Sequence, residues 1–72
     1  MSHHHEMTDT DKLAHLLHHW QEHNQEHSAN YASWANKAEA AGQKEVAELL
    51  RQAAQTTDEV TELFIKAGRY FK

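Results

Sequence analysis

Residues 13–42 read LAHLLHHWQEHNQEHSANYASWANKAEAAG, and this stretch contains no Pro and no Gly before Gly42. Apolar and aromatic residues recur in it at alternating steps of four and three, with two polar residues in the series. This is the heptad spacing of a helix that packs along another helix. We therefore expect one long helix over residues 9–41. Its seam consists of Leu13, Leu17, Trp20, Asn24, His27, Tyr31, Trp34, Ala38 and Ala41.

The segments on either side of this stretch indicate where the helices begin and end. Residues 8–11 offer capping hydroxyls and two carboxylates, which suit the amino-terminal end of a helix. Gly42 can adopt the left-handed conformation that ends a helix, so it marks a turn. The steps of four and three then resume, and they predict a second helix over residues 44–70. Its seam consists of Val46, Leu50, Ala53, Thr57, Val60, Phe64, Ala67 and Phe71.

These two helices predict an all-α fold, an antiparallel two-helix hairpin within a single domain of residues 9–72. Residues 1–8 are polar and rich in His, without apolar periodicity, and are expected to form a flexible arm. Because so small a domain gains little stability from one core, we expect two hairpins to dimerise into a four-helix bundle. Small residues would permit close approach near the turn: Ala38, Ala41, Ala53 and Ala54. The alternatives are an isolated hairpin, or a first helix broken at residues 28–30 to give three helices.

Composition argues against several classes of function. A chain of 72 residues supports one small domain and no deep enzyme cleft. It has no Cys, which excludes thiolate metal sites and leaves imidazole, carboxylate and water as ligands, suited to Ni(II), Zn(II), Co(II) and Cu(II). The net charge of −4 argues against nucleic acid as a partner. No apolar run is long enough to span a membrane and no signal-peptide core is present, so we expect a soluble, cytoplasmic protein without a membrane partner.

A ladder of four imidazoles, His15, His19, His23 and His27, repeats at every fourth residue of the first predicted helix. Side chains four apart are neighbours on a helix, with roughly 5–6 Å between their Cβ atoms, so adjacent pairs can grip one divalent metal ion. Each step of four also turns about 40° around the helix, which carries the ladder from solvent toward the seam. We therefore expect His19, His23 and His27 to be the better-formed metal site, with His15 and His18 as accessory ligands.

Polar residues beside the ladder can support metal binding. Glu22 and Glu26 interleave with the histidines and can serve as further ligands or accept hydrogen bonds from the ring N–H groups. Asn24 and Glu26 are expected to orient the ligands. Another interpretation stays open, since a polar residue in a heptad seam often fixes register, and Asn24 with His27 can do only that. Imidazoles also change charge between about pH 5 and 8, so the ladder can act as a proton-responsive switch.

The amino-terminal arm carries a second, independent metal motif. A free amine with His at the third position binds Cu(II) or Ni(II) in a square plane. His3 completes this pattern when Met1 is retained, and His4 takes the third place when Met1 is removed. The same run of histidines also fits the remnant of a purification tag, so both interpretations stay open.

Two metalloenzyme motifs are missing from the chain, whereas counting residues leaves a Ser or Thr nucleophile with a base open. Di-iron carboxylate bundles use Glu-x-x-His, whereas here the order is reversed, as His19-x-x-Glu22 and His23-x-x-Glu26. The peptidase motif His-Glu-x-x-His does not occur either. A narrow hairpin also has no enclosed pocket from which water is excluded. We therefore expect a protein that is not an enzyme.

The motif His19-Trp20-x-x-His23-Asn24-x-x-His27, followed by Tyr31, Trp34 and Gly42, resembles that of an uncharacterised small His-rich helical domain family. Members of that family occur alone or attached to small nickel-binding proteins of carbon monoxide dehydrogenase maturation. The resemblance covers about residues 11–70. It implies nickel as the metal, held through His19, His23 and His27 with Asn24 beside them, and a metalloenzyme maturation protein as a possible partner. His15, His18 and residues 3–5 look particular to this chain, and it holds no attached nickel-binding domain.

Two functional hypotheses follow. The first is a non-enzymatic protein that binds a divalent metal, with Ni(II) favoured, for storage, delivery or sensing. The second is a helical interaction or structural module without a specific metal, in which the histidines give a pH response. A chelator should change the stability or oligomeric state of the protein under the first hypothesis and leave both unchanged under the second.

Overall fold

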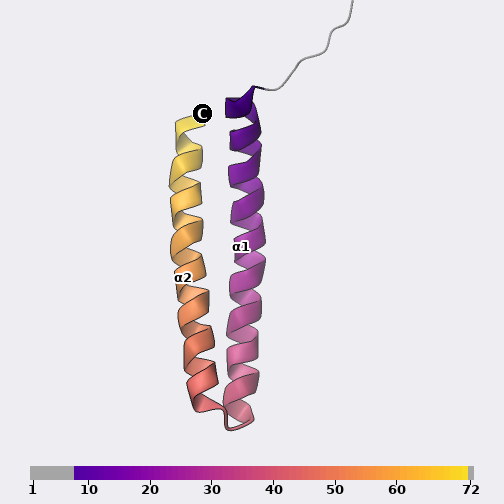
Figure 1. Cartoon of the computed structure of the whole chain (residues 1–72), viewed down its shortest axis with the longest axis vertical. Helices are drawn as coiled ribbons and strands as arrows, with labels where there is room; N and C mark the ends of the chain where they lie inside the picture. Colours follow the sequence, from indigo (N-terminus) through magenta and orange to yellow (C-terminus); the bar gives the residue numbers. More distant parts are fainter. Residues whose placement is uncertain (1–7, 72) are drawn as a thin grey trace, which may run out of the picture.

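The computed structural model describes residues 8–71, which form two long antiparallel helices followed by a short helical turn (Figure 1). Helix α1 spans Asp9–Ala40, helix α2 spans Lys44–Gly68, and a 3-10 turn, η1, spans Arg69–Phe71. The two helices lie side by side along their length, so the expected all-α hairpin is confirmed. Helix α1 runs without interruption through residues 28–30, which rules out the three-helix alternative.

The first turn of α1 is held by a reciprocal cap at its amino-terminal end. The Thr8 hydroxyl accepts a hydrogen bond from the Asp11 backbone N–H over 3.1 Å. The Asp11 carboxylate in turn accepts one from the Thr8 backbone N–H over 3.2 Å. This capping box pairs two donors that an open helix end would leave to solvent, and it explains why the helix begins at Asp9.

The turn between the helices depends on Gly42, which has a φ of +81°. Its backbone N–H donates to the Glu39 carbonyl over 2.9 Å, and the Gln43 N–H donates to the Ala38 carbonyl over 2.8 Å. These two bonds form a Schellman motif, which requires a left-handed residue at this position. Glycine adopts that conformation without a Cβ clash, so the expected turn at Gly42 is confirmed.

Small side chains make the contact between the two helices. The buried residues are Leu17, Ser28, Ala35, Ala47, Ala54 and Thr61, and no large side chain of residues 8–71 is completely buried. The Ser28 hydroxyl donates to the Ala54 carbonyl across the contact over 3.2 Å. Within α2, the Thr61 hydroxyl donates to the Thr57 carbonyl over 2.9 Å. Each buried hydroxyl thus has a partner, and the small residues allow the helix axes to approach closely.

On α1 the predicted seam is correct at every second member and exposed at the others, whereas on α2 six of its eight members are half-buried as expected. Leu17, Asn24, Tyr31 and Ala38 are buried or half-buried as expected. Ser28 and Ala35 are buried in place of His27 and Trp34, and on α2 Ala47 is buried in place of Val46. Two tryptophans in the contact would hold the axes apart, whereas Ser and Ala let them close. Helix α1 is therefore turned so that Trp34 leaves the contact and Trp20 lies at its edge, against Phe64.

Large apolar side chains outside the contact form an apolar flank, which we define as Leu13, Leu16, Trp20 and Trp34 of α1 with Val46, Leu49 and Leu63 of α2. Their exposed fractions range from 38% for Trp20 to 64% for Leu49. The Trp20 and Phe64 rings approach to 5.6 Å between centroids, which ties the two helices together on this side. Within residues 8–71, no helix combines the length and the hydropathy that a membrane span requires.

Candidate metal site

Three of the ladder histidines form a continuous row of rings on α1. The centroids of His19 and His23 lie 5.4 Å apart, and those of His23 and His27 lie 4.7 Å apart. A fourth ring continues the row, because Tyr31 stacks on His27 with 6.0 Å between centroids and 14° between planes. The helix thus brings His19, His23 and His27 together as the spacing predicts. Tyr31 was expected only in the seam, although it follows His27 by the same four residues.

His27 differs from the expectation in its surroundings. The heptad seam predicted this ring inside the helix–helix contact, whereas His27 is exposed and Ser28 takes the buried position. The small hydroxyl fits between closely spaced helices and an imidazole does not. All three imidazoles of the row therefore face solvent. They are open to an ion, and their rotamers are not held by burial against α2.

Carboxylates accompany the row on one side. His19, Glu22, His23 and Glu26 line a shallow hollow of about 200 Å³ on the surface of α1. Glu26 is thus beside the two imidazoles that it was expected to support. Glu22 lines the same hollow but also lies 3.3 Å from His18, measured between Oε1 and Nε2. An exposed hollow lined by carboxylates and imidazoles favours a cation.

Asn24 lies on the other side of His23, toward α2. It is half-buried and lines a second hollow together with Trp20, His23, Val60 and Phe64. His23 is therefore the residue shared by the carboxylate side and the apolar side of the row. This position makes His23 the centre of the candidate site.

The rings are neighbours without forming a complete ligand set. Within residues 8–71, no group of three His, Asp or Glu side chains is close enough together to hold a metal ion. The row offers adjacent pairs instead, His19 with His23 and His23 with His27. Two imidazoles leave at least two positions of a tetrahedral ion to be filled by other groups.

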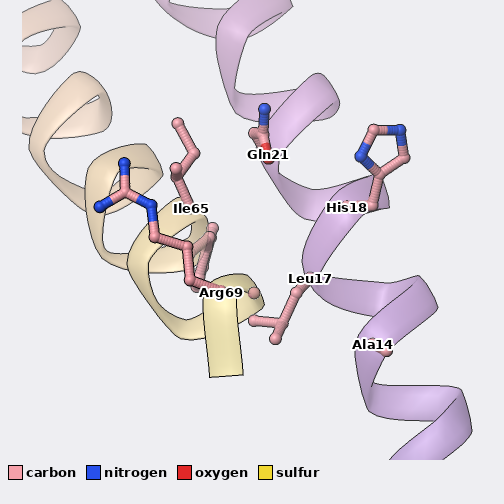
Figure 2. A pocket seen from close by; sticks show the side chains of 8 residues that line it. Ala14, Leu17, His18, Gln21, Ile65 and Arg69 are labelled. Atoms are coloured by element: carbon pink, nitrogen blue, oxygen red, sulfur yellow. The ribbon is translucent and has the colours of Figure 1, made fainter. Parts of the chain in front are cut away.

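The remaining candidate ligands lie outside the row. His15 is exposed one turn before His19. His4 lies outside the described residues. His18 lies beside a separate groove, and Figure 2 shows its ring pointing away from α2, whereas Leu17 points toward α2. This groove is lined by Ala14, Leu17, His18, Gln21, Phe64, Ile65, Gly68 and Arg69. The Arg69 guanidinium makes it a poor site for a cation.

Comparisons with known proteins find relatives whose descriptions state no activity. A family model described as "Domain of unknown function (DUF8180)" matches residues 13–70. An uncharacterised protein of Archaeoglobus fulgidus is 42% identical over 57 residues, which cover 79% of this chain and 90% of the relative. No solved structure matches the chain. The region matched by the family model contains the whole row from His19 to Tyr31.

Proposed function

The chain belongs to the family of domains of unknown function DUF8180, and we propose that it is a non-enzymatic protein that binds a divalent metal ion for storage, delivery or sensing. The observation that carries this proposal is the continuous row of imidazoles from His19 to His27, with ring centroids 4.7 to 5.4 Å apart. Ni(II) is the favoured metal, and Zn(II), Co(II) and Cu(II) suit the same ligands.

The chemistry of the row supports this choice. Imidazoles one helical turn apart can bind the same ion after small rotamer changes, and these rings are free to rotate because they are exposed. Glu22 and Glu26 beside His19 and His23 can add an oxygen ligand or accept a hydrogen bond from the ring nitrogen that does not bind the ion. Nickel ranks above zinc because of the resemblance of the His-Trp-x-x-His-Asn-x-x-His motif to domains attached to nickel-binding proteins.

The proposal includes a homodimer that pairs two hairpins as a four-helix bundle. It is supported by the small core, since Leu17 is the one large apolar side chain that is buried in residues 8–71. A metalloenzyme maturation protein as a further partner and a cytoplasmic location belong to the same proposal, and both rest on the sequence alone.

One observation favours a second candidate function. The apolar flank exposes several large side chains, which is typical of a surface that binds another protein. Under this alternative the chain is a helical interaction or structural module, and its histidines give only a pH response. The two functions differ in whether a metal ion binds tightly at a defined ratio.

Calorimetric titration of Ni(II), and separately of Zn(II), tests the proposal. The protein is the chelator-treated full chain with His3, His4 and His5 each replaced by Ala, so that the arm cannot contribute. We expect saturable, submicromolar binding. Replacing His23 and His27 together with Ala should weaken binding at least about tenfold, which corresponds to about 1.4 kcal/mol.

The matched control is His15→Ala, which removes an exposed imidazole outside the row and should change affinity much less. Weak, unsaturable uptake of both metals would overturn the proposal and favour the interaction module. Equal affinity of the His23→Ala/His27→Ala variant would remove these two residues from the site.

A further inference from the structure

The apolar flank has a charge pattern that differs from the rest of the surface. The flank belongs to a wider set of positions that recur every seven residues, from Leu13 and Leu16 on α1 and from Val46 and Leu49 on α2, and no Asp or Glu occupies any of these positions. Three residues at the positions of this wider set are basic or imidazole side chains, namely His23, His27 and Lys37. The Lys37 ammonium lies over the Trp34 ring, 4.2 Å from its centroid. The flank is thus a surface from which carboxylates are excluded.

The opposite edge of the hairpin is polar. There Arg51 of α2 pairs with Glu39 of α1 over 2.6 Å and donates to the Asn36 side chain over 3.2 Å. In an antiparallel pair, equivalent flanks of the two helices lie on the same side, so the bulky residues of α1 and α2 form one face. The hollow shared by Trp20, His23, Val60 and Phe64 lies across both helices on that face.

The size of this face matches what a stable protein interface needs. The exposed parts of its seven large apolar side chains amount to roughly 700 Å², close to the about 800 Å² that each partner buries in a complex of standard size. A hairpin whose buried apolar residues are one Leu and three Ala also lacks a core large enough for a small domain. A second copy supplies the same acid-free apolar face and completes that core.

Symmetry places the histidines of two such copies together. His23 and His27 lie near the midpoint of α1, which spans Asp9–Ala40. If the twofold axis of the dimer runs parallel to the helices, each residue lies at the same height along the bundle in both copies. A twofold axis across the helices reverses the levels but leaves the midpoint in place. When the crosswise axis passes through that midpoint, either arrangement of two faces brings the four imidazoles within about one helical turn of each other along the bundle.

We propose that a second copy of this chain docks on the apolar flank and that His23 and His27 of both copies complete one four-imidazole site for a divalent metal. This inference rests on the metal binding proposed above. Within one chain the row offers only pairs of imidazole ligands. Two chains together supply four imidazole nitrogens, which complete the coordination of a tetrahedral ion such as Zn(II). Ni(II) can add water to the same four nitrogens.

Sedimentation equilibrium combined with titration of Zn(II) chloride tests this inference on the full chain with His3, His4 and His5 replaced by Ala. We expect a mass near twice 8.3 kDa and one zinc ion per two chains. Leu63→Glu places a carboxylate on the flank at a position that is not itself a proposed ligand. It should give monomers and weaken zinc binding at least about tenfold. The control Gln55→Glu adds the same charge at an exposed position off the flank and should change neither property.

The outcomes separate this inference from the proposed function. A monomer that binds one zinc ion per chain would overturn the shared site and leave metal binding intact. A dimer that survives Leu63→Glu would show that the flank is not the interface, and would overturn the inference as well. A dimer that Leu63→Glu splits but that takes up no zinc would overturn the shared metal site, and the titration of Ni(II) described above then decides the proposed function. The ratio of zinc to unsubstituted chains decides the question even where Leu63→Glu unfolds the hairpin.

Discussion

At the scale of single residues, the adjacent pair His27 and Ser28 links the fold to the candidate site. Ser28 occupies the buried position and satisfies its hydroxyl on the Ala54 carbonyl of the other helix. His27 is consequently exposed, with its ring between those of His23 and Tyr31. Because the buried position falls on Ser28 and not on His27, the His27 imidazole is exposed and can serve as a metal ligand.

Ser28→Leu tests this assignment. A large side chain at a buried position between close helices overpacks the contact, so we expect a loss of about 1 to 3 kcal/mol in the free energy of unfolding. Urea denaturation followed by circular dichroism measures it. The control is Ser33→Leu, the same change at an exposed position of α1, which should stay within about 0.5 kcal/mol of the unsubstituted chain. Equal stability of the two variants would contradict the burial of Ser28.

At the scale of elements, the two glycines have different roles. Gly42 ends the turn after α1 with a φ of +81°, whereas Gly68 is the last residue of α2 and has no such backbone. Among residues 8–71, a Cβ at either glycine would meet no heavy atom within 4 Å outside its own local helix. The effect of an Ala substitution at each site therefore depends on backbone conformation alone.

We expect Gly42→Ala and Gly68→Ala to change stability in opposite directions. A left-handed alanine costs about 1 to 2 kcal/mol, so Gly42→Ala should destabilise the hairpin by that amount. Gly68→Ala should stabilise it by about 0.5 to 1 kcal/mol, because alanine loses less conformational entropy in a helix. Thermal unfolding of both variants at one protein concentration checks the signs. A Gly42→Ala variant as stable as the parent would show that the turn does not need the Schellman geometry.

At the scale of the whole molecule, folding and association are expected to be linked. The buried set is small, while the large apolar side chains lie on one face of the hairpin. We expect a single hairpin with this distribution to gain no more from burial than the ordering of its backbone costs. The second copy that we propose supplies the missing contact.

The midpoint of thermal unfolding should therefore rise with protein concentration. A dimer that dissociates as it unfolds is stabilised by mass action, whereas the unfolding of a monomer does not depend on concentration. Calorimetry of the metal-free chain over at least a hundredfold range of concentration measures this. Leu63→Glu should remove the dependence and Gln55→Glu should keep it. A constant midpoint in the unsubstituted chain would favour the isolated hairpin.

The sequence by itself determined the two helices, the turn and the row of imidazoles, because each depends on local spacing. The cap at Thr8, the left-handed Gly42 and the steps of four between histidines act within a few residues of the chain. The tertiary structure alone decided which side of each helix is buried. Apolar residues occupy more than one stripe on both helices, so the spacing alone permits either of two stripes of each helix to face the other helix. The choice between them depends on side-chain volume when the helices meet, and the line of Ser, Thr and Ala allows the closer approach. For the same reason Trp34 and His27 were expected in the contact and lie outside it.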